Sequence, residues 1–353
     1  MHRCVPKRRN SGLRWASALG ALALWVCLPV LDLASAAEDV VYLAGSSGRP
    51  GARLTGQIVD YTGRELRLRT ITGQERVFPA ARVARVSTER SQQHVQADRL
   101  MAARQYPQAI EQYRAALEAD RENRNWVRRQ FIAQMVWCYR AVGQPDQAGE
   151  YFLILLASDG ETLHFDCIPL AWISQEPGAA LEQKAAAWLA RQDSPVANLM
   201  GASHLLASPR RSQAIERLNA LAASADTRVA SLARAQLWRT KSLAAGAAKA
   251  SAWRKELESV PEPLRAGPYF VLGSALASTQ PDEGALALLR VPICYPRERR
   301  LSAAALLASA ACLEKLRSPQ DAQRLYRELT QQHPESLEAA EASRRLEAQR
   351  SDG

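Results

Sequence analysis

The chain has 353 residues, and its 46 Lys and Arg side chains outnumber its 36 Asp and Glu side chains by ten. This excess is modest for the length and is spread over many segments, so it does not indicate a nucleic-acid partner; a basic chain of this kind can simply favour anionic surfaces. The length exceeds what one small core requires, which excludes a single small domain and indicates a repeat array or two to three domains.

The first 36 residues have the order of a secretory signal. Basic side chains come first, an apolar run covers residues 16–30, and the small residues Ala34, Ser35 and Ala36 end the segment. The run is shorter than the ~20 residues that span a bilayer, and its small-residue end suits a peptidase better than a stop-transfer anchor. We therefore predict cleavage near Ala36 and an exported protein of the periplasm or cell envelope. The alternative is an uncleaved leader that keeps the protein on the membrane; no later segment is apolar enough to cross one. The basic side chains are Arg3, Lys7, Arg8, Arg9 and Arg14.

Cleavage would leave 41 basic and 35 acidic side chains in residues 37–353, together with four cysteines. Four is an even number in a compartment that permits disulfides. However, Cys138 and Cys312 lie among apolar residues of helix-like segments, where a buried free thiol is the commoner state. The other two are Cys167 and Cys294, and the sequence selects no pairing among the four.

Residues 38–90 form a predicted β module. Short β-rich runs cover residues 40–43, 54–59, 66–71, 76–78 and 83–86. Gly63 and Gly73 supply tight turns between them, because glycine accepts a positive φ without steric cost. Pro79 lacks the donor that a central strand needs, so it marks a break before the last strand. The layout resembles a small SH3-like or Sm-like barrel in its pattern, without a diagnostic motif.

Two interpretations of this module stay open. As a binding platform, it would offer an edge strand or a groove to a peptide, a glycan or an anionic polymer such as nucleic acid. As a cap or spacer, it would only support the helices that follow. Four arginines could form a basic face, but two glutamates interleave with them and aromatic side chains are few, which favours the cap. The charged residues are Arg64, Arg67, Arg69 and Arg76, with Glu65 and Glu75.

From residue 91 onward, alanine, leucine, glutamine and arginine occur with helical spacing, and three helix pairs resemble one another. The first has Ala97, Leu100, Tyr106, Ala109, Tyr113 and Ala116; the second has Tyr139, Gly143, Ala148 and Phe152; the third has Ala310, Leu313, Ala322, Tyr326, Leu329 and Pro334. These positions resemble the tetratricopeptide repeat (TPR) family, in which small alanines let two helices approach and aromatic residues fill the gaps beside them.

The resemblance implies a mainly α fold: a helical-repeat, TPR-like solenoid preceded by the small SH3/Sm-like β module. TPR-like repeats are expected over residues 91–157 and 265–348, with degenerate helical repeats over 158–264. The middle region keeps the small-residue and leucine positions but loses the aromatic ones, and the family's consensus tryptophan is not matched. Residues 158–176 and 241–263 fit no repeat.

Catalytic signatures such as HExxH, CxxC, GxxxxGK[ST] and GxGxxG are absent from the sequence. The nearest candidate is His164-Phe165-Asp166-Cys167, which holds three residues that could bind a metal or act as a nucleophile. Adjacent residues of a regular element cannot all point at one ion, and the other histidines are isolated. We therefore expect no enzyme, no metal and no cofactor. An envelope enzyme or enzyme accessory with a site near His164 to Cys167 is the alternative.

Binding residues are expected among aromatic and basic side chains. Trp126 is surrounded in sequence by arginines, and it is either part of a solvated helix face or an anchor for a partner. The arginines are Arg121, Arg124, Arg128 and Arg129. A second segment, residues 291–300, packs two prolines, a tyrosine and three arginines between two helical units. It is either a plain connector or an exposed recognition loop.

The function that we predict is protein binding, by an exported scaffold such as an accessory factor of envelope assembly or secretion. Stacked helical repeats offer a long concave surface, and affinity on such a surface comes from a few buried anchors. The expected partner is a protein whose identity the sequence does not give. Besides the enzyme, the alternative is binding of an anionic polymer by the β module.

Overall fold

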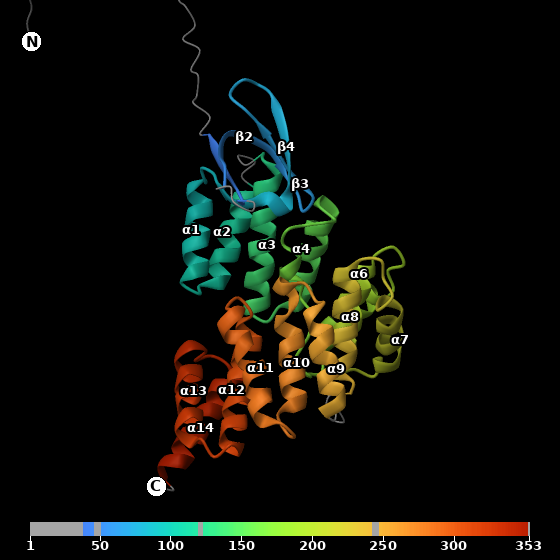
Figure 1. Ribbon diagram of the computed structural model, residues 1–353, viewed down its shortest axis with the longest axis vertical. Helices are drawn as coiled ribbons and strands as arrows, with labels where there is room; N and C mark the ends of the chain where they lie inside the picture. The colour runs from blue at the N-terminus through green and yellow to red at the C-terminus, as the bar shows by residue number, and fades with distance from the viewer. Residues whose placement is uncertain (1–37, 46–50, 119–122, 242–246, 352–353) are drawn as a thin grey trace, which may run out of the picture. The chain divides into compact units, whose positions relative to one another are not determined.

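The computed structural model describes residues 38–45, 51–118, 123–241 and 247–351. The predicted signal, residues 1–36, and Arg121 lie outside the described residues. In the described part of the chain, five β-strands precede fourteen α-helices, so the protein is mainly helical with a small sheet on its N-terminal side, as predicted (Figure 1). No helix of that part combines the length and the apolarity needed to cross a membrane.

The five strands pair antiparallel in the order β4-β3-β2-β1-β5. They are β1 (Asp39–Leu43), β2 (Arg53–Tyr61), β3 (Glu65–Arg69), β4 (Glu75–Pro79) and β5 (Val83–Ser87). Each predicted run is a strand, but β3 ends two residues earlier than expected. Thr70 instead donates its N–H to the carbonyl of Gln74 at 2.9 Å, and Gly73 closes the turn with a φ of 81°. Pro79 ends an edge strand, where its missing donor costs no ladder bond.

One face of the sheet is buried. Val41, Ile58 and Leu66 are at most 1% exposed and Phe78 is 7% exposed, and all four belong to the same apolar cluster as Phe131 of the helical region. Side chains alternate along a strand, so the opposite face of the sheet points away from this core. The sheet and the helices therefore share one core.

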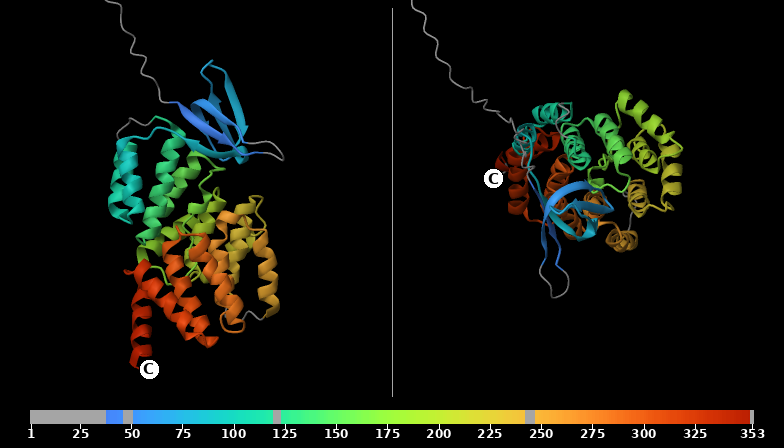
Figure 2. Two further views of the ribbon diagram at one scale, coloured as in Figure 1. Left: turned by 60° about the vertical axis from the view of Figure 1, so that its left-hand side comes forward. Right: turned by 90° about the horizontal axis from the view of Figure 1, so that it is seen from above.

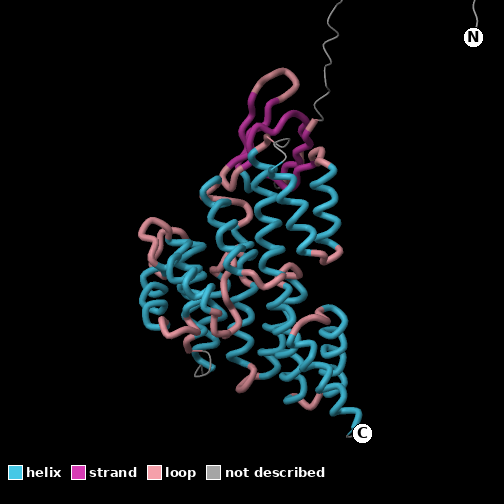
Figure 3. The backbone as a smooth tube through the Cα atoms, turned by 180° about the vertical axis from the view of Figure 1, so that it is seen from behind, coloured by secondary structure: helices cyan, strands magenta, loops and turns pink. Residues whose placement is uncertain are grey.

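Most consecutive helices pack against each other, as Figures 2 and 3 show, and α8 also contacts α10. The helices are α1 (Gln92–Ala102), α2 (Tyr106–Glu118), α3 (Asn125–Ala141), α4 (Pro145–Ser158), α5 (Ala179–Leu189), α6 (Pro195–Leu205), α7 (Arg211–Leu221), α8 (Thr227–Arg239), α9 (Ala247–Glu258), α10 (Ala266–Leu276), α11 (Pro281–Cys294), α12 (Arg299–Lys315), α13 (Pro319–Gln332) and α14 (Leu337–Ser351). Four of them begin with proline, whose missing N–H would have no partner within the helix there.

Three connections between helices share one hydrogen-bonded geometry. Their bonds run from the N–H of Gln105 to the carbonyl of Leu100, from Gln144 to Tyr139 and from Ser318 to Leu313, each at 2.9 Å. The residue before each donor is left-handed, with φ of 63° at Arg104, 76° at Gly143 and 58° at Arg317. This is the arrangement of a Schellman cap. The three helix pairs that look most alike in sequence are thus closed by the same turn.

The residues that define the predicted repeats lie mostly in the core. Buried members are Ala97, Ala109, Tyr113, Ala116, Tyr139, Ala148, Phe152, Ala310, Ala322, Tyr326 and Leu329. Leu100, Tyr106 and Leu313 are half-buried, and Pro334 is exposed beyond the end of α13.

Residues 159–178 connect α4 to α5 without an α-helix and contain only the short 3₁₀ segment η2 (Phe165–Cys167). The connection is nevertheless packed: Cys167 is fully buried, and Trp172 lies against Gly267 of α10. A Cβ at Gly267 would lie 1.9 Å from the indole of Trp172, so only glycine permits this approach. The segment thereby lines the space between α3 and α12. The other segment for which no repeat was expected, residues 241–263, contains α9.

Candidate binding cleft

The predicted basic and aromatic cluster lies at the start of α3. Trp126 is only 2% exposed, and the guanidinium carbon of Arg124 lies 5.7 Å from the centre of its ring. Arg124 donates to Oγ1 of Thr88 at 2.7 Å, and Arg128 donates to the carbonyl of Leu117 at 3.2 Å. In this structure, Trp126, Arg124 and Arg128 therefore make contacts within the protein.

Arg129 of the same cluster links the helices to the sheet. It is 5% exposed, forms an ion pair with Asp60 of β2 and donates to the carbonyl of Tyr61 at 3.0 Å. A buried guanidinium with a carboxylate partner is a structural bond, because breaking it would leave a charge unpaired in the interior. Arg121 lies outside the described residues, so the structure does not place it.

The segment around His164 is arranged unlike a nucleophilic site. Burial lowers the pKa of His164 to about 4, with the positive charges of Arg297 and Arg129 adding to the effect. Burial also raises the pKa of the Cys167 thiol well above its ordinary value. The pair is therefore a neutral imidazole and a protonated thiol, whereas nucleophilic catalysis by cysteine needs a thiolate.

Metal and disulfide chemistry find no support in the described residues. In that part of the chain, no three His, Cys, Asp or Glu side chains gather closely enough to hold a metal ion. The four cysteines of the described residues are free: three are buried, and Cys294 is exposed.

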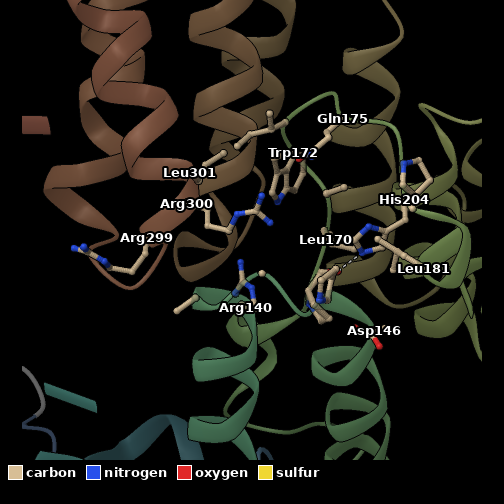
Figure 4. A pocket seen from close by; sticks show the side chains of 18 of the residues that line it. Arg140, Asp146, Leu170, Trp172, Gln175, Leu181, His204, Arg299, Arg300 and Leu301 are labelled. Atoms are coloured by element: carbon tan, nitrogen blue, oxygen red, sulfur yellow. Dashed lines mark hydrogen bonds between the residues drawn. The ribbon is translucent and has the colours of Figure 1, made fainter. Parts of the chain in front are cut away.

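A cleft of about 530 Å³ opens where the end of α3, the start of α4, the connecting segment and the start of α12 meet. Its lining includes Arg140, Asp146, Trp172, His204 and Arg300. In Figure 4, Arg140 and Arg300 point from opposite sides into the space beside Trp172, whereas Arg299 points away from it. Helices far apart in the sequence thus present two guanidinium groups to one cleft.

A second cleft of about 460 Å³ adjoins the first, with Ala141, Arg297 and Arg299 in both linings. Its own lining includes Arg90, Asp98, Arg104, Tyr106, Gln134 and Trp137. We call the two together the junction cleft, defined by Arg90, Arg104, Arg140, Arg297, Arg299 and Arg300.

Positive charge in the junction cleft exceeds what its own carboxylates neutralise. Arg90 pairs with Asp98 at 2.5 Å, and Arg140 pairs with Glu298 at 2.5 Å. Within the described residues, the guanidinium groups of Arg297 and Arg300 make no hydrogen bond or ion pair; that of Arg297 lies 5.9 Å from the ring centre of Trp137 and acts on the buried Asp166 through its charge alone. The cleft thus carries guanidinium groups that could bind an anion.

Positive charges also lie close together in the second cleft, and they lower the pKa values of their neighbours. Burial, and then the charge of Arg104, lower the pKa of Arg299. Burial, followed by the charges of Arg299 and Arg104, lowers the pKa of the neighbouring His333 to about 4. A cation in this cleft is disfavoured by its neighbours, so an incoming anion would be favoured.

No protein-family model matches the sequence, and no curated protein matches it either. We therefore infer a function from the residues of the fold and the cleft.

The sequence did not reveal this cleft, although one signal was present. Arg299 and Arg300 occupy the first turn of α12, which contains no acidic residue. Cations are disfavoured at a helix N-terminus by the helix dipole, so two arginines there invite a functional explanation. The sequence predicts either a connector or a recognition loop over residues 291–300, and its three arginines line the junction cleft. Arg104 and Arg140 gave no such signal, because only the fold brings them near α12.

Proposed function

We propose that this protein is a scaffold that binds an acidic, extended segment of a partner protein in the junction cleft. The observation that carries the proposal is the presence there of Arg297 and Arg300, whose guanidinium groups form no ion pair among the described residues. Guanidinium groups bind carboxylates through paired hydrogen bonds, and such charge-assisted bonds are stronger than neutral ones.

Several features of the cleft suit a peptide better than a small metabolite. The two adjoining cavities form a continuous cleft along which an extended chain could lie, and not one enclosed cavity. Gln134 has a buried Oε1 that accepts no hydrogen bond within the described residues, so it could accept one from a peptide N–H. Beside it, the guanidinium of Arg140 lies over the indole of Trp137 at 4.3 Å, and this contact fixes the orientation of the arginine in the cleft.

We propose that the scaffold is a TPR-like helical solenoid. The support is the shared Schellman turn after α1, α3 and α12, and the burial of the small alanines that bring the paired helices together. A repeat array buries its core by stacking neighbours, and the consecutive packing of the helices is compatible with that principle. The sheet, with its proposed SH3/Sm-like character, would cap the array by bonding to Arg129 of α3, in the second helix pair.

Export to the cell envelope belongs to the same proposal and depends on the sequence of residues 1–36. The enzyme alternative near His164 is less favoured, because burial keeps the Cys167 thiol protonated.

Fluorescence anisotropy tests the cleft. Residues 37–353 would be titrated against two labelled peptides of about ten residues, ~33 Å when extended, one rich in Asp and Glu and the other in Asn and Gln. We expect binding of the acidic peptide alone. The double variant Arg297→Glu with Arg300→Glu should weaken it roughly 10- to 100-fold, because two charge-assisted contacts are lost.

The matched control is Arg324→Glu with Arg327→Glu on the exposed side of α13, which changes the net charge equally. It should leave the affinity within about two-fold once salt has screened the long-range charge. Equal affinity for the two peptides, or an equal loss in the control, would refute the proposed site. The same two variants can then be used to identify the partner by capture from envelope extracts.

A further inference from the structure

The side of the sheet opposite the core is a basic surface that the proposed function does not use. We call it the outer face, meaning the side that carries Tyr42, Arg53, Arg67, Arg69, Val77 and Arg85. In contrast to the buried face, its arginines at positions 53, 69 and 85 are exposed, and Val77 is 55% exposed.

A row of three side chains crosses the outer face. Tyr42 of β1 lies directly opposite Arg53 of β2 and directly opposite Arg85 of β5. Directly paired residues in an antiparallel sheet project on the same side, so the tyrosine stands between two arginines. The guanidinium carbon of Arg85 lies 4.3 Å from the ring centre of Tyr42, which fixes the orientation of that arginine.

A second group of charges lies on β3 and β4. Arg69 is opposite Glu75 and pairs with it at 2.7 Å, whereas Arg67 is opposite the apolar Val77. Within the described residues, Arg53, Arg67 and Arg85 make no ion pair. The other acidic residues with this orientation are Glu65 and Asp60, which is paired opposite Arg67 but forms its ion pair with Arg129. Positive charge therefore prevails on the outer face.

Apolar side chains accompany these arginines. Ile71 lies at the turn of the β3–β4 hairpin, which projects away from the helices in Figures 1 and 3, and it is 79% exposed. Large aliphatic side chains this exposed are costly in water and gain by entering an apolar environment.

We propose that the outer face docks on a bilayer that contains anionic phospholipid, with its arginines at the headgroups and Ile71 in the interface. Arginines near an anionic membrane gain from its negative surface potential, and aliphatic side chains gain from partial burial in the interface. A soluble anionic polymer would use the arginines but would leave Ile71 and Val77 in water. Proteins that bind single-stranded nucleic acid also need exposed aromatic side chains on which bases can stack, and the ring of Tyr42 is already covered by Arg85.

Co-sedimentation with vesicles tests this surface on residues 37–353, which lack the apolar leader. We expect sedimentation with vesicles of phosphatidylcholine mixed with phosphatidylglycerol, but not with phosphatidylcholine alone, and a decline as salt rises. Arg53→Glu with Arg85→Glu should lower the partition coefficient roughly 30-fold or more, since two arginines leave the anionic surface. Ile71→Ser should lower it several-fold.

Two control variants separate this site from others. Arg324→Glu with Arg327→Glu alters the charge equally on α13, and Arg297→Glu with Arg300→Glu alters the junction cleft; both should sediment like the parent. Near-ultraviolet circular dichroism would show that each variant is folded. The proposal is overturned if phosphatidylglycerol confers no binding, or if either control loses as much as the outer-face variant. It is also overturned if the parent binds dextran sulfate as tightly as the vesicles and Ile71→Ser changes neither, because the ligand would then be a polymer.

Discussion

Arg104 and Arg299 donate hydrogen bonds to the same acceptor, the carbonyl oxygen of Gln332. Arg104 lies in the turn after α1 and Arg299 begins α12, so the two ends of the helical region meet at this point. Gln332 ends α13, where the helix dipole leaves partial negative charge on the last carbonyls. That acceptor offsets part of the repulsion between the guanidinium groups and holds both at the edge of the second cleft.

Arg104→Gln should raise the pKa of His333. Burial is the largest cause of its lowered pKa of about 4, and the charges of Arg299 and Arg104 follow, so removal of one charge moves the pKa upward without restoring the ordinary value. NMR titration of the imidazole would measure the change. The control variant is Arg317→Gln. Arg317 also has a left-handed backbone conformation, but its charge is not among those that act on His333, so this variant should leave the pKa of His333 unchanged. An unchanged or lower pKa in Arg104→Gln would show that the cationic cluster is not formed in solution.

Arg129→Met should destabilise the protein and detach the sheet from the helices. The variant keeps an apolar stem but leaves Asp60 and the carbonyl of Tyr61 without their buried partner, which costs on the order of 3 kcal/mol. Hydrogen exchange should show lost protection in β2 and β3 with little change in α12 and α13. Arg69→Met, which removes the exposed pair with Glu75, should cost less than about 1 kcal/mol. Similar losses in the two variants would contradict a special role for Arg129.

Much of the fold was predictable because its signals are local. Period-two runs and glycine turns located all five strands. Two strand ends were misplaced by two residues: β2 continues to Tyr61, and β3 stops at Arg69 because Thr70 bonds to Gln74 across the turn. The matching turns after α1, α3 and α12 follow from similar local sequences, although only one contains glycine. Helix α9 lies in a segment that fits no repeat pattern, so the sequence did not give its bounds.

The candidate site was less predictable, because it is a tertiary feature. Trp126 and its arginines are adjacent in sequence, but adjacency did not show that Arg129 would bond to Asp60 in the sheet. The junction cleft, in contrast, combines Arg104, Arg140 and Arg300 from three separate helical segments. Spacing along the chain cannot reveal such a combination.

The protein should lose stability as the pH falls from about 6.5 to about 4. Burial lowers the pKa of His204 to about 4, and its Nε2 lies 2.9 Å from the carbonyl oxygen of Pro169. Because the folded pKa lies below the unfolded value of about 6.5, the unfolded state binds the proton more readily in this window. The stability is therefore fully present above about pH 6.5 and is lost as the pH approaches 4. His164 and His333 act in the same direction, whereas the raised pKa of Asp166 opposes it.

Urea unfolding at pH 7.5 and pH 4.5 would measure this dependence. His204 and His164 should each contribute a loss on the order of 2 kcal/mol, and His333 should add to it. His204→Gln removes the titrating group but keeps an amide donor for Pro169, so the variant should show a smaller difference between the two pH values, whatever its stability at pH 7.5. A parent whose stability is equal at both values would contradict the burial of these imidazoles.

Thiol labelling should distinguish one cysteine from the other three in residues 37–353. Cys294 is exposed at the end of α11, whereas burial raises the pKa of Cys138 to about 12 and that of Cys167 well above the ordinary value. Since only an accessible thiolate reacts, an aromatic disulfide reagent should label Cys294 rapidly and the buried thiols, including Cys312, only as the protein unfolds. In denaturant without reductant, all four should react, and Cys294→Ser should abolish the fast phase alone. Fewer than four reactive thiols in the denatured parent would reveal a disulfide and contradict the free cysteines of the structure. A fast phase that persists in Cys294→Ser would show that a second thiol is accessible in the folded protein.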